Sequence, residues 1–91
     1  MTVTVHVPGA LRVYCGGARE LTLSAPSVGD TLIELERRYP SLYRSVCDET
    51  GAVRRHVNVF VNSANVRDLQ GLGTPLVPGD IVTILPAVSG G

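Results

Sequence analysis

The sequence predicts an α+β fold in which a mixed sheet of four to five strands packs on one main helix. Three observations support this prediction: alternating polar and apolar residues in three segments, an apolar run near the C-terminus, and one strongly amphipathic helical segment between them. The 91 residues suffice for one domain with its own core. We therefore expect a single domain over residues 1-88 and a flexible C-terminal diglycine tail over residues 89-91.

The first two strands are predicted at residues 2–7 and 20–24, where apolar side chains occupy every second position. In the first strand the valines would point inward. A loop through Cys15, Gly16 and Gly17 separates the two strands. This spacing favours a hairpin, with the two strands as antiparallel neighbours.

The main helix is predicted to begin at a capping box, in which the Ser27 hydroxyl accepts from the Asp30 amide and the Asp30 carboxylate reaches back. Pro40 is expected to end the helix. Four side chains between these points share one helical face: Val28, Leu32, Leu35 and Tyr39. We expect this face to cover the sheet.

The second half of the chain supplies the remaining strands. Residues 41–55 are polar and predict a long loop, with at most a helical turn around residues 42–46. Residues 56–62 alternate and predict a strand, residues 66–76 a connector, and residues 78–80 a tight turn before the last strand. With the last strand beside the first in the middle of the sheet, the order of elements predicts the β-grasp, ubiquitin-like arrangement.

Composition excludes several classes of function. Eight basic and eight acidic residues give no net charge, so no nucleic acid or membrane partner is indicated. The two cysteines, Cys15 and Cys47, lack metal-binding spacing and are expected to be free thiols, as in a reducing cytoplasm. No apolar stretch approaches the ~18 residues of a membrane span. All eight basic residues are arginines, so the N-terminal amine is the single amine available for acylation.

The C-terminus carries the strongest functional signal. An apolar run from Ile81 leads directly into Val88, Ser89, Gly90 and Gly91. Because glycine has no Cβ and tolerates any backbone twist, such a tail can be threaded through a narrow channel of another protein. We interpret the terminal carboxyl group of Gly91 as the reactive group, and Val88, Ser89 and Gly90 as the residues that are threaded.

Four segments together resemble the ubiquitin-like sulfur carrier proteins of the ThiS/MoaD family, most closely the CysO type. They are Leu11-Arg12 with Gly16-Gly17; residues 57–62 (VNVFVN) with Val66-Arg67; Gly79-Asp80; and residues 82–91 (VTILPAVSGG). The last of these is the most specific, because it couples a strand to the diglycine at a fixed distance. Ser89 departs from the alanine expected there, but serine is small enough for the same channel.

The resemblance implies a carrier and not an enzyme. In the family, an E1-like adenylyltransferase or sulfurtransferase uses ATP and a sulfur donor to convert the C-terminal carboxylate, here that of Gly91, into an acyl-adenylate and then a thiocarboxylate. A sulfur-accepting biosynthetic enzyme then takes the sulfur, with cysteine the product that the CysO type favours over thiamin, molybdopterin or a thiolated natural product. The protein itself would bind no cofactor or metal, stay in the cytoplasm and be monomeric when free.

Strand parity predicts where such partners would dock. If the valines of residues 57–61 face the helix, Phe60 faces away from it. The polar Thr83 places Ile81, Thr83 and Leu85 on the same outward face of the last strand. We expect Phe60 and Leu85 to form an exposed apolar patch beside the tail, with Ile81 and Thr83.

Two other functions remain open from the sequence. One is a ubiquitin-like protein modifier joined through Gly91 to lysines of target proteins. The other is a binding module on the same fold whose tail has no chemical role. The mass of the C-terminus in protein purified from its native context would separate the three.

Overall fold

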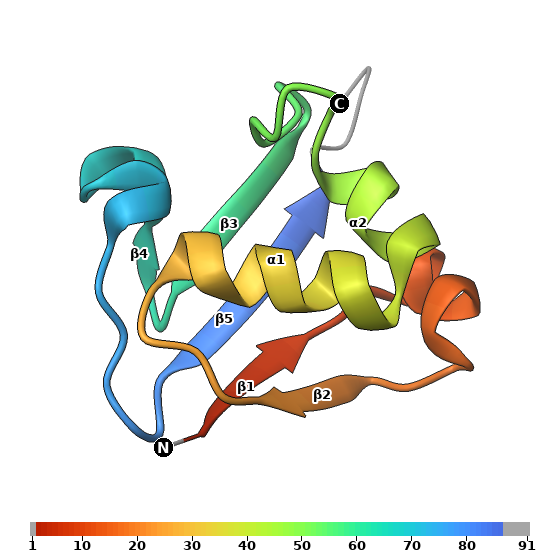
Figure 1. The fold of residues 1–91 in the computed structure, drawn as a ribbon, viewed down its shortest axis with the longest axis horizontal. Helices are drawn as coiled ribbons and strands as arrows, with labels where there is room; N and C mark the ends of the chain where they lie inside the picture. The colour runs from red at the N-terminus through yellow and green to blue at the C-terminus, as the bar shows by residue number, and fades with distance from the viewer. Residues whose placement is uncertain (1, 87–91) are drawn as a thin grey trace.

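The computed structural model describes residues 2–86, which form a five-stranded mixed sheet with two α-helices on one face (Figure 1). The sheet order is β2-β1-β5-β3-β4, with β1 and β5 parallel and the other neighbours antiparallel. The strands are β1 (Val3–His6), β2 (Glu20–Leu23), β3 (Val57–Val61), β4 (Ala64–Asn65) and β5 (Ile81–Pro86). The predicted β-grasp fold is confirmed, with the last strand in the centre beside the first.

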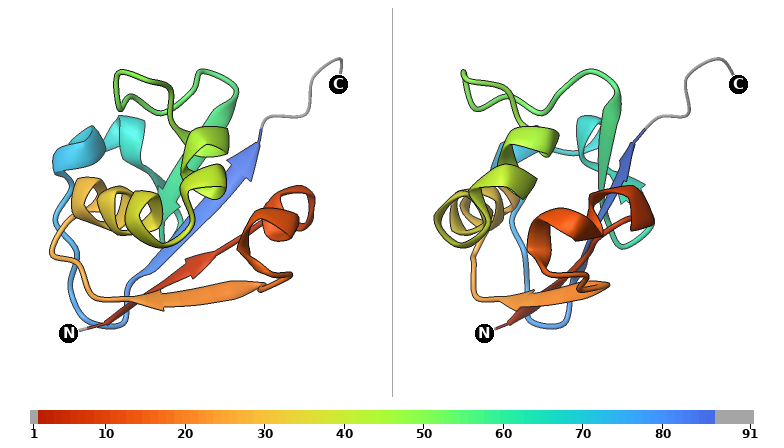
Figure 2. Two further views of the ribbon diagram at one scale, coloured as in Figure 1. Left: turned by 45° about the vertical axis from the view of Figure 1, so that its right-hand side comes forward. Right: turned by 90° about the vertical axis from the view of Figure 1, so that its right-hand side faces the viewer.

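Helix α1 (Val28–Arg38) crosses one face of the sheet (Figure 2), and the helical face predicted to cover the sheet is buried. Val28, Leu32 and Leu35 are buried, and Tyr39 packs partly against the same core. The N-cap is confirmed, since Ser27 Oγ accepts from the Asp30 amide at 3.1 Å. The return bond differs from the prediction: the Asp30 carboxylate accepts from the Ser27 hydroxyl at 2.8 Å. Aspartate is one methylene shorter than the glutamate of a full capping box, which explains the shorter reach.

Residues 40–46 are more regular than the predicted loop of residues 41–55, in which only a helical turn around residues 42–46 was expected. They form a second helix, α2 (Pro40–Val46), which starts one residue after α1 is capped. Proline is well suited to the first position of a helix, because its missing N–H has no helical partner there in any case. Leu42 and Val46 lie four residues apart and are both fully buried. Pro40 therefore ends one helix and begins the next.

The first loop is also more regular than predicted. Residues Gly9–Cys15 form a 3-10 helix, closed by Gly16 in the left-handed region at a φ of 69°. The connector after β4 contains two single-turn 3-10 helices, Val66–Asp68 and Gly71–Gly73. The first three predicted strands are each one or two residues longer than the strands found.

One hydrophobic core lies between the sheet and the helices. Cys15 and Cys47 are part of it, and both are free thiols, as expected. Among the described residues, no helix has the length and hydropathy needed to cross a bilayer. Within residues 2–86, no three His, Cys, Asp or Glu side chains gather closely enough to hold a metal ion.

Candidate docking face and the end of strand β5

The face of the sheet turned away from α1 and α2 is formed by alternate residues of the strands. In β3 the three valines are buried, whereas Asn58 and Phe60 are half-buried on the outer side. In β5, Val82 and Ile84 are buried, while Ile81 is 36% exposed and Leu85 is 46% exposed. The strand parity deduced from the sequence is therefore confirmed in both strands.

The pairing of β3 with β5 brings the four predicted docking residues together. Phe60 lies directly opposite Thr83 and diagonal to Ile81 and Leu85, within reach of an aromatic ring. We call Phe60, Ile81, Thr83 and Leu85 the docking strip. It is apolar apart from Thr83, and it runs along the outer face toward the end of β5. Its role in binding a partner stays a prediction.

A polar frame along the free edge of β3 borders this strip. The Arg67 guanidinium donates to Asn58 Oδ1 at 2.7 Å, to the Val57 carbonyl at 2.9 Å and to the Arg54 carbonyl at 3.3 Å. Asn65 Nδ2 also donates to Asn58 Oδ1, at 3.3 Å. Strand β4 pairs with β3 only at Phe60 and Val61. Arg67 therefore lies along the preceding part of this edge of β3, which has no neighbouring strand. The sequence singled out Arg67 only as part of the Val66-Arg67 segment that resembles the family. The acceptors of the Arg67 guanidinium could not be deduced from the sequence.

The start of β5 is fixed by a second polar contact. Asn62 has a φ of 54°, a left-handed conformation that asparagine tolerates better than most residues. Its side chain accepts from the Ile81 amide at 3.1 Å and donates to Asp80 Oδ1 at 3.1 Å. These bonds set the register in which β5 lies between β1 and β3.

Strand β5 reaches Pro86, which lies opposite Val57 at the start of β3. The next residues continue from this end of the sheet. Val88, Ser89, Gly90 and Gly91 lie outside the described residues, as does the predicted domain boundary after residue 88. The threading and reactive-carboxyl predictions therefore rest on the sequence.

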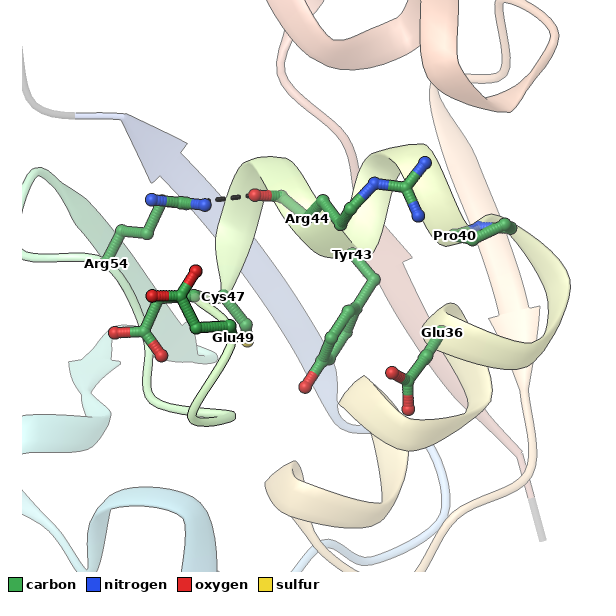
Figure 3. Close-up of a pocket in the computed structure, with 8 residues that line it drawn as sticks. Glu36, Pro40, Tyr43, Arg44, Cys47, Glu49 and Arg54 are labelled. Carbon is green, nitrogen blue, oxygen red and sulfur yellow. Dashed lines mark hydrogen bonds between the residues drawn. The ribbon is translucent and has the colours of Figure 1, made fainter.

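A polar cavity of about 300 Å³ lies on the other side of the molecule, beside α2 (Figure 3). Figure 3 shows Arg54 directed to the Arg44 carbonyl, to which its Nε donates at 2.9 Å. Asp48 accepts from the Thr50 hydroxyl and amide, and these bonds hold the pKa of its carboxyl group below the ordinary value. The cavity is lined by Glu36, Pro40, Tyr43, Arg44, Cys47, Asp48, Glu49 and Arg54.

The thiol in this cavity is poorly suited to nucleophilic chemistry. Burial, reinforced by the negative charge of Asp48, raises the pKa of Cys47 to about 11. Burial also raises the pKa of the neighbouring Tyr43 phenol. Because the thiolate is the reactive form, Cys47 stays protonated and unreactive near neutral pH. Cys47 is therefore not a candidate nucleophile.

Comparisons of the sequence and of the structure with known proteins agree on one family. The model of the ThiS family matches residues 5–91. The sulfur carrier protein CysO of Mycobacterium tuberculosis is 40% identical over 93 aligned positions, covering all of both chains. Its crystal structure superimposes with a TM-score of 0.87 at 39% identity, over 94% of this chain and 99% of that one.

Two further relatives extend the comparison. A chain of the crystal structure of the Amycolatopsis orientalis BexX/CysO complex gives a TM-score of 0.89 at 35% identity, covering 98% of this chain and 99% of that one. Small archaeal modifier protein 3 of Haloferax volcanii is 42% identical over 65 residues, 71% of this chain and 70% of its own. With a family match over nearly its whole length and full-length relatives at this identity, the chain belongs to the ThiS family.

Proposed function

We propose that this protein is a sulfur carrier whose Gly91 carboxyl group is converted to a thiocarboxylate. The observation that carries the proposal is the full-length similarity to CysO, which is named as a sulfur carrier protein and is 40% identical. The family match runs through to residue 91 and so includes the diglycine. The β-grasp body, with β5 ending at Pro86, supports the same reading.

The chemistry follows from the poor reactivity of a carboxylate. An ATP-dependent partner joins the Gly91 carboxylate to AMP and releases pyrophosphate, which gives a mixed anhydride. A persulfide or sulfide attacks the acyl carbon, and AMP leaves. The thiocarboxylate then serves as the sulfur source for a second enzyme. In this scheme the chain is a co-substrate, and ATP and the sulfur donor are bound by the activating enzyme.

The docking strip is the proposed contact for these partners. It lies on the outer face of β3 and β5 and leads to the end of the strand from which the tail continues. The BexX/CysO complex supports the view that a CysO-type chain forms a specific complex with another protein. Cysteine is the favoured final product by similarity to CysO, with other sulfur-containing metabolites as alternatives.

Intact mass spectrometry tests the proposal. Protein co-expressed with the genes of its native operon should show a C-terminus in which one oxygen has been replaced by sulfur. A Gly91→Val variant should stay folded but lose this mass change, because the branched side chain blocks threading into the activating site. Normal conversion of the valine variant would contradict the threading mechanism. An unmodified C-terminus in the wild type under sulfur demand would contradict sulfur carriage and favour a plain binding module.

A second candidate is a protein modifier joined to other proteins through Gly91. The similarity to small archaeal modifier protein 3 favours it. Both functions begin with the same acyl-adenylate and differ in the nucleophile that attacks it. Lysine-linked adducts of higher mass that end in Gly91 would support the modifier, and their digestion products would identify the target lysines.

A further inference from the structure

We propose that the polar cavity beside α2 binds a small zwitterion in which one carbon atom joins an ammonium group to a carboxylate group, as in a free α-amino acid. The cavity shares no residue with the docking strip, and the sulfur-carrier chemistry does not use it. Binding there goes beyond the proposed function and does not depend on it.

The cavity is large enough for such a molecule. Its volume of about 300 Å³ lies at the lower end of the range of small-molecule sites in proteins, about 300–1,000 Å³. Three elements form it: the last turns of α1, helix α2 and the loop that follows α2. The walls therefore come from three successive segments of the chain that are packed together.

Charges of both signs line this cavity without pairing to one another. Arg44 and Arg54 contribute positive charge. The negative charge comes from Glu36, Asp48 and Glu49. The ion pairs formed within residues 2–86 all lie elsewhere, on α1 and between β1 and β2. Figure 3 shows the two guanidinium groups on one side of the cavity and the Glu36 carboxylate on the other. A ligand with a single charge would meet a like charge here, whereas a zwitterion can satisfy both signs.

The carboxylate of Asp48 is held in place with one oxygen available. Its Oδ1 accepts from the Thr50 hydroxyl at 2.6 Å, from the Thr50 amide at 2.8 Å and from the Ala52 amide at 3.2 Å. In the described part of the chain, Oδ2 accepts no hydrogen bond. The bonds from Thr50 hold the pKa of this carboxyl group below its ordinary value, so it is ionised at neutral pH. Such a fixed carboxylate suits an ammonium group, because little side-chain freedom remains to be lost on binding.

The Arg54 guanidinium is anchored as well. Its Nε donates to the Arg44 carbonyl at 2.9 Å. The Arg54 backbone amide donates to the Val46 carbonyl at 2.9 Å, and a bridge between Cys47 and Val53 joins the same two segments. Among residues 2–86, the two Nη groups have no hydrogen-bond acceptor. They are therefore available for charge-assisted hydrogen bonds to a ligand carboxylate.

Asp48 and Arg54 are near each other but form no ion pair. The positive charge of Arg54 contributes to the lowered pKa of Asp48, after the larger effect of the bonds from Thr50. In an α-amino acid, a single carbon separates the ammonium nitrogen from the carboxyl carbon. One small ligand can therefore place its ammonium group on Asp48 and its carboxylate on Arg54.

The remaining lining suits a small apolar side chain. It consists of Pro40, the ring of Tyr43 and the buried thiol of Cys47. Burial raises the pKa of both the phenol and the thiol, so both groups are neutral near pH 7. Within the described residues, the groups with clearly shifted pKa values all line this cavity, as is common at binding sites. L-Valine, with a compact branched side chain, is therefore the chosen probe.

An NMR titration of the full chain tests the proposal. Backbone amide shifts of the isotope-labelled protein are followed as L-valine is added at constant ionic strength. Two comparators each lack one charged group: isovalerate has no ammonium group, and isobutylamine has no carboxylate. We expect saturable shifts in α2 and in residues 47–54, a Kd on the order of 1 mM for L-valine, and at least tenfold weaker binding of either comparator.

The variant Asp48→Asn removes the charge, while its amide oxygen can still accept from Thr50 and Ala52. We expect it to bind L-valine about tenfold more weakly than the wild type. Asp68→Asn is the matched control, because Asp68 is exposed in the 3-10 helix after β4, outside the cavity, and it should bind as the wild type does. Circular dichroism melting establishes that both variants are folded.

Three results would overturn the proposal: no saturable shift with L-valine, equal binding of either comparator, or unchanged affinity in folded Asp48→Asn. The comparator titrations need the wild type alone, so they decide the question even if a variant is unstable. The titration uses no activating enzyme and no change at Gly91, so its outcome is separate from the mass-spectrometric test of sulfur carriage.

Discussion

Phe60 is the chain's single phenylalanine, and it lies on the outer face of the sheet, not in the core. A large aromatic side chain at a half-buried surface position keeps apolar area available for a partner. Its neighbours Ile81 and Leu85 are more exposed than Phe60, at 36% and 46%. Aromatic residues in such surroundings often dominate the free energy of binding.

We expect Phe60→Ala to weaken binding to the activating enzyme by about 30-fold, equivalent to about 2 kcal/mol. The folded state should lose little stability, because the ring is not in the core. Isothermal titration calorimetry against the activating enzyme gives the measurement. Ile33→Ala is the matched control, since Ile33 is 56% exposed on α1, on the opposite side of the sheet. If Phe60→Ala bound the activating enzyme as tightly as the wild type, the proposed role of the docking strip in binding would be wrong.

Cys47 illustrates a different effect, in which burial sets the charge state of a single residue. Its folded-state pKa is about 11, whereas an unfolded cysteine titrates near 8.5. Between these values the unfolded chain has released the proton and the folded chain has kept it. The free energy of unfolding should therefore fall as pH rises through this window.

We predict a loss of about 2 kcal/mol in the free energy of unfolding between pH 9 and pH 11 that is attributable to Cys47. Urea unfolding of wild type and Cys47→Ala across this range isolates it, because the alanine variant lacks the titrating thiol. The pKa of Tyr43 is also raised, mainly by burial and to a smaller extent by Cys47 itself, so the Tyr43 contribution differs between the two proteins only in that smaller part. Parallel pH profiles for the two proteins would refute the assignment.

At the scale of elements, Arg67 ties the 3-10 helix after β4 to the start of β3. Its guanidinium donates to the carbonyls of Arg54 and Val57 and to the Asn58 amide oxygen, and it is a second donor for the Arg54 and Asn58 oxygens. The planar fork of arginine suits such a set of acceptors, and the compact ammonium of lysine does not.

Arg67→Ala should therefore lower the free energy of unfolding by about 2 kcal/mol, with Arg67→Lys recovering only part of it. Arg55→Ala, at an exposed position, should change it by less than about 0.5 kcal/mol. Chemical denaturation of the three variants measures these differences. If Arg67→Ala were as mild as Arg55→Ala, the edge contacts would contribute little to stability.

The elements that the sequence predicted correctly are those in which one periodic pattern dominates. Alternating valines specify β1 and β3, and the apolar face from Val28 to Tyr39 specifies α1. Helix α2 was predicted only as a helical turn, because Pro40 signals both an end and a beginning, and because only Leu42 and Val46 mark its buried side. The 3-10 helix Gly9–Cys15 has no periodic pattern long enough to detect.

The docking strip could be predicted because parity within a strand is a local property. The contacts of Arg67 could not, since they join residues 9 to 13 positions apart across a strand edge. Nor could the raised pKa of Cys47, which depends on the packing of α2 against the loop that follows it.

For the whole molecule, the order of elements was sufficient to predict the topology. The sequence predicts a hairpin, then a helix that crosses the sheet, then further strands. In this order the last strand is expected at the centre of the sheet, and β5 lies there between β1 and β3. The chain has no net charge, and its charges are mixed locally as well, because Asp48 and Glu49 line the same cavity as Arg44 and Arg54.

The parallel pairing of β1 with β5 has a practical consequence for handling the protein. Thr2 is held beside Gly79, at the pole opposite Pro86 (Figure 1). A purification tag, fluorophore or surface anchor attached ahead of Thr2 would thus lie at the opposite end of the sheet from Pro86, after which the proposed reactive tail follows. Immobilised in that orientation, the carrier should present its C-terminus to enzymes in solution as freely as the untagged chain does.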